Sequence, residues 1–195
     1  MIAREETGKR PPAEETVMQK HPLIGLTGTN GAGKGEVAAI LRRRGYAYTS
    51  LSDVIRESLR SQGRALSRDN LIAQGNALRR DRGPDILARL ALETCAGPTV
   101  IDSIRNPAEV AFLRRQPGFL LVAVDAPPAV RFERARRRGR DESAETLEAF
   151  LAKENEEKND DPEAQQLDRC LALADITIQN DGTLEDLERR LEEAL

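Results

Sequence analysis

Short apolar runs recur along the chain, separated by longer stretches in which apolar residues have helical spacing. The clearest run lies at residues 119–124 (Phe-Leu-Leu-Val-Ala-Val), and shorter ones lie at residues 23–26, 46–48, 99–101 and 176–178. A strand that is apolar throughout is buried on both faces, which is typical of parallel sheets covered by helices on each side. The pattern therefore predicts an α/β fold with a five-stranded parallel sheet and helices on both faces.

The helices predicted between these strands are bounded by glycine. The first starts at Glu36 and ends near Gly45, since glycine is the usual stop for a helix. Thr183 is the expected N-cap of a last helix that runs to Leu195. Two or three further helices are expected within residues 53–95, broken at Gly63, Gly75 and Gly83-Pro84.

Composition divides the chain into a polar start and one larger domain. Residues 1–20 carry four acids, four bases and almost nothing apolar. Such a segment buries too little surface to offset the entropy of ordering, which predicts a disordered tail. Residues 21–195 suit a single domain. Within it, residues 131–140 hold six arginines and residues 141–161 hold nine acids, so we expect a surface helix pair with an exposed connection.

Charge and composition exclude several classes of protein. A net charge of −3 and 3% aromatic residues argue against a nucleic-acid surface, which needs basic charge and stacking rings. One histidine and two cysteines, Cys95 and Cys170, cannot form a zinc cluster. No apolar stretch approaches the ~20 residues that span a bilayer, and the first residues lack the apolar core of a signal peptide. We therefore expect a cytoplasmic protein that binds neither membrane nor nucleic acid.

A glycine-rich stretch follows the first predicted strand directly. Residues 28–35 read Gly-Thr-Asn-Gly-Ala-Gly-Lys-Gly, which matches the phosphate-loop pattern but ends in glycine where serine or threonine is usual. Glycine lets the backbone curl so that successive N–H groups point at one anion, and the start of the next helix adds partial positive charge. Strand, loop and helix together predict an ATP site formed by Gly28, Asn30, Gly31, Ala32, Gly33, Lys34, Gly35 and Glu36.

The Gly-x-Gly-Lys-Gly core of this loop resembles that of adenylate kinase and related nucleoside monophosphate kinases, where glycine also follows the lysine. Threonine normally comes next in that family, whereas this chain has Glu36. Magnesium is therefore expected to be held largely by water and by the nucleotide phosphates. The resemblance implies a three-layer P-loop fold with an acceptor-binding insertion at residues 53–95 and a lid at residues 136–162. Closure of the lid would exclude water from the reaction.

Two later segments resemble the acceptor side of the same family. Residues 50–56 are similar to the start of the acceptor-binding lobe, which ends in an arginine for the acceptor phosphate, here Arg56. Residues 101–105 are similar to a strand end with an aspartate near magnesium, here Asp102 acting through water. The same segment ends in a second acceptor arginine, Arg105, one residue closer than is common.

The donor side and two further positions complete the expected site. Arg134 and Arg138 lie one helical turn apart where the chain resembles the start of the lid, and would close over the donor phosphates. With Lys34 and Asp102 they are the expected catalytic residues. Residues 174–182 instead resemble the C-terminal strand of dephospho-coenzyme A kinase. On the acceptor side, two more candidates are Asp53, which alternatively caps the helix that it opens, and Gln74, which would touch an acceptor base.

These observations predict ATP-dependent phosphoryl transfer to a nucleoside or deoxynucleoside monophosphate, with ATP and Mg²⁺ as cofactors. Such an acceptor offers an oxygen that is already anionic and needs no general base, which suits a chain rich in arginine. One alternative is phosphorylation of a hydroxyl, as in dephospho-coenzyme A kinase, with Asp53 as base. Another is a nucleotide-dependent switch or assembly factor without a small acceptor. A monomer or weak dimer whose partner is a small nucleotide is expected.

Overall fold

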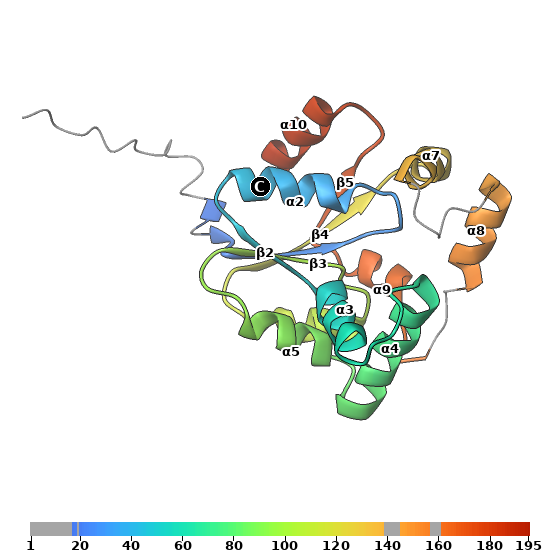
Figure 1. The fold of residues 1–195 in the computed structure, drawn as a ribbon. Coiled ribbons are helices and arrows are strands. Elements are labelled where there is room, and N and C mark those ends of the chain that lie inside the picture. Colours follow the sequence, from blue (N-terminus) through green and yellow to red (C-terminus); the bar gives the residue numbers. More distant parts are fainter. Residues whose placement is uncertain (1–16, 19, 139–144, 157–160) are drawn as a thin grey trace, which may run out of the picture.

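A computed structural model of the chain describes residues 17–18, 20–138, 145–156 and 161–195 (Figure 1). The expected tail therefore lies almost wholly outside the described residues, as do residues 139–144 and 157–160 of the expected lid. The strands are β1 (Leu23–Thr27), β2 (Ala47–Ser50), β3 (Thr99–Asp102), β4 (Phe119–Asp125) and β5 (Ile176–Gln179). The helices are α2 (Lys34–Arg43), α3 (Leu51–Ser61), α4 (Arg68–Arg82), α5 (Ile86–Glu93), α6 (Pro107–Leu113), α7 (Pro128–Arg138), α8 (Leu147–Glu156), α9 (Leu167–Ala172) and α10 (Leu184–Ala194).

The five strands form one parallel sheet in the order β2-β3-β1-β4-β5, as the apolar runs predicted. β1 lies at the centre, where Gly25 pairs with Ile101 of β3 and with Leu121 of β4. From β1 the chain crosses to the edge strand β2, returns to β3 beside β1, and then adds β4 and β5 on the other side of β1. The carboxyl ends of the strands therefore open a crevice beside β1, which is where α/β sheets bind ligands.

Helices cover both faces of the sheet, as predicted. α2 and α10 lie on one face, and α3, α4, α5 and α9 lie on the other (Figure 1). Alternate residues of β4 point to opposite faces of the sheet. Val122 belongs to the core cluster that contains Leu41 and Leu191, whereas Leu121 belongs to the cluster that contains Leu59. The three inner strands, β1, β3 and β4, are largely apolar because both of their faces are buried, whereas the edge strands β2 and β5 are partly exposed.

Two local expectations differ from the structure. Gly75 does not break a helix but lies inside α4, where an added Cβ would come within 2.9 Å of Cδ1 of Ile55. Glycine at this position lets α4 approach α3 closely, and the breaks fall at Gly63 and Gly83 instead. β2 is an edge strand that begins at Ala47, and two of its four residues are exposed, which explains its weak apolar signal.

The ends of the helices match their sequence signals in two further places. Thr183 caps α10, because its Oγ1 accepts the N–H of Asp186 at 3.2 Å. α7 and α8 form the predicted helix pair, with the rings of Phe132 and Phe150 5.9 Å apart. Within the described part of the chain, no helix has both the length and the apolar character needed to cross a bilayer.

Candidate functional site

The glycine-rich loop joins β1 to α2 in a backbone conformation that only glycine adopts readily. Gly28, Gly31 and Gly33 have φ angles of 148°, 79° and 102°. A Cβ at Gly28 would lie 2.2 Å from the carbonyl oxygen of Val124, so the loop also packs directly on β4. Gly33 is the N-cap of α2 and makes no side-chain cap. The first turn of α2 thus faces the loop as an anion-binding helix start.

Alanine substitutions at the two ends of this loop are expected to differ in their effect on stability. Gly28→Ala should lower the free energy of unfolding by about 2–4 kcal/mol, because of the positive φ and the clash with β4. Gly35→Ala should change it little, since a Cβ there meets nothing within 4 Å. Urea denaturation of both variants checks this, and equal destabilisation would contradict the packing described. The same open space shows that a hydroxyl side chain would fit at Gly35.

Lys34 reaches back over the loop from the start of α2. Its Nζ donates to the carbonyl oxygens of Gly28, at 2.6 Å, and Thr29, at 3.0 Å. Loss of solvent around the ammonium group lowers the pKa of Lys34 to about 8, helped by the charge of Arg105 and opposed by that of Asp102. A bound polyanion would favour the charged form, so the lysine is prepared for a phosphate ligand.

The pH dependence of ATP binding should follow the protonation of Lys34. As pH rises through about 8 the ammonium group loses its proton, so ATP affinity should fall by up to about tenfold per pH unit. Lys34→Arg keeps its charge in this range and should have a flatter profile. Calorimetric titration of both proteins with ATP between pH 7 and 9.5 checks the difference. Parallel profiles would show that Lys34 does not set the pH dependence.

Asn180 and Arg134 stabilise the loop through hydrogen bonds from residues that follow β5 and lie in α7. The Nδ2 of Asn180 donates to the carbonyl oxygen of Ala32 at 2.8 Å, and the Nη1 of Arg134 donates to the carbonyl oxygen of Asn180 at 2.9 Å. An added Cβ at Gly33 would lie 2.0 Å from the same Nδ2. Asn180 was not among the residues expected at the site, although its place just after β5, at the carboxyl edge of the sheet, is a usable signal.

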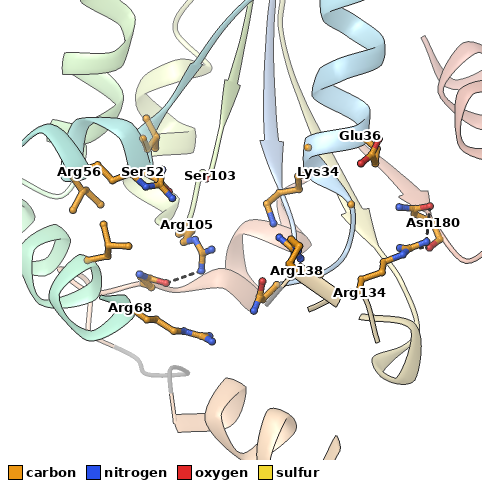
Figure 2. A pocket seen from close by; sticks show the side chains of 18 of the residues that line it. Lys34, Glu36, Ser52, Arg56, Arg68, Ser103, Arg105, Arg134, Arg138 and Asn180 are labelled. Atoms are coloured by element: carbon orange, nitrogen blue, oxygen red, sulfur yellow. Dashed lines mark hydrogen bonds between the residues drawn. The ribbon is translucent and has the colours of Figure 1, made fainter. Parts of the chain in front are cut away.

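A cleft of about 640 Å³ opens in front of the loop at the carboxyl ends of the strands (Figure 2). Arg56 and Arg105, expected on the acceptor side, line this cleft together with Lys34 and Arg138. The Nη1 of Arg105 donates to Oε1 of Gln165 at 3.1 Å. The acceptor side has an apolar wall formed by Leu51, Ile55, Leu71, Ile72 and Leu87.

Positive charge is concentrated in this cleft, although the whole chain carries a net charge of −3. Among the described residues that line it, Glu36 is the only acid. The basic residues lining it are Lys34, Arg56, Arg68, Arg79, Arg105, Arg134, Arg137 and Arg138. Such focused positive charge favours a ligand with several negative charges. Arg68 was not expected from the sequence, because no motif marks it and only the fold brings α4 to the cleft.

Three residues expected at the site outside the glycine-rich loop do not line the cleft. Asp53 has an exposed side chain that pairs with Arg56 at 2.8 Å, and Ser50 rather than Asp53 caps α3. Gln74 is buried between α3 and α4, where its Nε2 donates to Oγ of Ser58 at 3.0 Å. The packing of the two helices therefore uses the amide that the sequence analysis placed against an acceptor base.

Asp102, the third, lies behind the cleft at the end of β3. Its Oδ1 accepts the N–H of Ser103 at 2.5 Å, and its Oδ2 accepts the hydroxyl of Tyr48 at 3.2 Å. The expected role of Asp102 in holding a magnesium ion through water stays a prediction. In the loop itself, Gly28 and Ala32 are buried behind the surface that faces the cleft.

Comparison with known proteins places this arrangement in a family. The family described as AAA domain matches residues 24–163. A UPF0200 protein of Pyrococcus horikoshii is 34% identical over 89% of this chain and 95% of its own, and one of Thermococcus onnurineus is 33% identical over 88% and 95%.

Solved structures give the same fold. The crystal structure of TT1252 from Thermus thermophilus has a TM-score of 0.59 at 28% identity, covering 89% of this chain and 96% of its own. Shikimate kinase from Bacteroides thetaiotaomicron has a TM-score of 0.58 at 18% identity, covering 88% and 96%. The expected resemblance to nucleoside monophosphate kinases is thus supported at the level of the P-loop kinase fold. With its fold, loop and relatives together, the chain belongs to the AAA-domain family of P-loop proteins, among the UPF0200 proteins.

Proposed function

We propose that this protein transfers the γ-phosphoryl group of ATP to the phosphate of a nucleoside or deoxynucleoside monophosphate. The observation that carries the proposal is the pairing, across one cleft, of the lysine-bearing phosphate loop with Arg56 and Arg105. A triphosphate in the loop and a second anion at these arginines would face each other. Phosphoryl transfer needs this positioning and charge neutralisation more than covalent chemistry.

The expected basic residues divide between the donor and the acceptor in the proposed reaction. Lys34, Arg134 and Arg138 would neutralise the charge that spreads over the transferred group. Arg56 and Arg105 would hold the acceptor phosphate and direct one of its oxygens at the γ-phosphorus. Magnesium held by Asp102 through water would supply further charge neutralisation on the donor phosphates.

A phosphate acceptor is favoured over a hydroxyl acceptor by the scarcity of acids in the cleft. Transfer to a hydroxyl requires a base within hydrogen-bond reach of its proton. Among the described residues that line the cleft the only acid is Glu36, at the start of α2 on the donor side. Asp53, the base that the hydroxyl alternative requires, is exposed and pairs with Arg56. An anionic oxygen needs no such base.

Asp53→Asn separates the two acceptor classes. If the acceptor is a phosphate, the variant should lose at most about tenfold in kcat, through the altered position of Arg56. If Asp53 were the base for a hydroxyl, kcat should fall by about 10²–10⁴-fold. Steady-state kinetics with the best acceptor found for the wild-type protein decides between these results.

The direct test of the proposal is an acceptor panel. The purified protein is incubated with ATP and Mg²⁺ and with each ribo- and deoxyribonucleoside monophosphate, with shikimate and dephospho-coenzyme A as hydroxyl acceptors, and without acceptor. We expect one or more monophosphates to become diphosphates. No conversion of any monophosphate would overturn the proposal, and ATP hydrolysis indifferent to every acceptor would favour the switch or assembly factor.

A further inference from the structure

A fully buried carboxylate lies close behind the acceptor side of the cleft without lining it. Glu109 belongs to the first turn of α6 and is 0% exposed. Its Oε1 accepts both Nε, at 3.0 Å, and Nη2, at 2.8 Å, of Arg79, which comes from α4 and is 2% exposed. Its Oε2 accepts the backbone N–H groups of Arg105, at 2.9 Å, and Asn106, at 3.0 Å.

This carboxylate is the centre of a network that holds the backbone of Arg105 from both sides. While Glu109 accepts the N–H of Arg105, the carbonyl oxygen of Arg105 accepts the N–H of Gln166 at 2.7 Å. The Nδ2 of Asn106 donates to the carbonyl oxygens of Pro162, at 2.7 Å, and Ala164, at 2.8 Å. These bonds therefore join three segments: helix α4, residues 105–106 between β3 and α6, and residues 162–166.

Helix capping accounts for only part of this arrangement. In a capping box the acid in the first turn accepts the N–H of the N-cap residue, and Glu109 does this for Asn106. The bond to Arg105 and the two bonds from Arg79 go beyond the cap. Burying an ion pair costs a large desolvation energy and is weak grounds for stability by itself. What the pair does achieve is to fix the backbone of a residue whose side chain lines the cleft.

We propose that Glu109, held by Arg79, is a positioning residue for the acceptor. It fixes the backbone of Arg105 so that the guanidinium group meets the acceptor's anionic group in line with the donor phosphate. The proposal deepens the proposed function and rests on it for the identity of the acceptor. A displacement of about 1 Å at a positioning group is enough to lower the rate by roughly 10²-fold. Loss of this buried anchor should therefore act on the acceptor and not on ATP.

Glu109→Gln tests the proposal, because the amide keeps the size of the side chain but cannot accept through both of its terminal atoms. We expect kcat/KM for the acceptor to fall by roughly 10–100-fold while KM for ATP stays within about twofold. Asp175→Asn is the matched control. Asp175 also accepts a backbone N–H, from Leu121 at 2.8 Å, and pairs with Arg114 at 2.8 Å, but it lies at the amino end of β5, away from the cleft. This control should leave both kinetic constants unchanged.

A second readout needs no substrate. Hydrogen exchange at the amides of Arg105 and Asn106 should accelerate in Glu109→Gln and stay unchanged in Asp175→Asn. If Glu109→Gln does not fold, Arg79→Lys gives the same test, because it keeps the charge but supplies fewer donors to Oε1. Equal losses for ATP and acceptor, or unchanged exchange at these two amides, would overturn the positioning role. If the wild-type protein converts no monophosphate, the proposed function fails while the exchange experiment still decides the role of Glu109.

A double-mutant cycle asks whether Glu109 acts through Arg105. Once Arg105 is replaced by methionine, adding Glu109→Gln should lower kcat/KM for the acceptor by less than about twofold further. Full additivity of the two losses would show that Glu109 acts by another route, and would overturn the proposal.

Discussion

Lys34→Met should reduce kcat for phosphoryl transfer by at least about 10²–10³-fold, the loss that follows when one charged donor is removed from a transition state. Lys34 lines the cleft at the junction of the glycine-rich loop and α2, close enough to Arg105 and Arg138 for their charges to lower its pKa. Methionine has a similar length and is apolar, so it leaves the packing largely intact. Single-turnover transfer from labelled ATP measures the effect.

Two control variants test whether the loss of activity comes from the charge of Lys34. Lys20→Met changes an exposed lysine that precedes β1, lies beside Gly118 and is outside the lining of the cleft, and should retain full activity. Lys34→Arg keeps the charge and should retain part of the wild-type activity. Activity of Lys34→Met close to that of the wild type would remove the phosphate loop from the mechanism, and with it the assignment of the donor site.

Arg105→Met should lower kcat/KM for the acceptor by about 10²–10³-fold and leave KM for ATP nearly unchanged. The reason is the position of Arg105, which lines the cleft on its proposed acceptor side and whose Nη1 donates to Oε1 of Gln165 at 3.1 Å. Truncation would leave the acceptor's charge without one of its guanidinium partners. Initial rates measured while each substrate is varied in turn separate the two effects.

Arg114→Met is the matched control for Arg105→Met. Arg114 follows α6 and pairs with Asp175 at the amino end of the sheet, so its loss should change stability slightly and leave both kinetic constants as they are. A rise in KM for ATP in Arg105→Met, with acceptor kinetics unchanged, would place Arg105 on the donor side. The proposed division of the cleft would then be wrong.

The apolar runs of the sequence were sufficient to predict the sheet, because strands buried on both faces carry no polar residues at their centres. Residues 119–124 were recognisable without any tertiary information and form most of β4. The phosphate loop was equally recognisable, since its glycines and Lys34 act within one short segment. Thr183 as the cap of α10 is a third case in which the signal and the structure it produces are a few residues apart.

Other parts of the fold and cleft depended on contacts between distant segments. Gly75 has the sequence signal of a helix break, yet it lies within α4 because α3 packs against it. Gln74 was expected to bind a ligand through its amide, yet this amide donates to Ser58 and accepts from Arg64. Asn180 reaches Ala32 across 148 positions of sequence, a contact that no local pattern encodes.

The sequence by itself determined the parallel sheet, the glycine loop and Lys34, whose causes lie in neighbouring residues. Only the tertiary structure decided that Arg68 reaches the cleft and that Glu109 is buried behind Arg105. The physical reason is that charged side chains on helices have no periodic signal that distinguishes a solvated position from one facing a ligand. Their partners, and therefore their chemistry, are fixed when distant segments pack together.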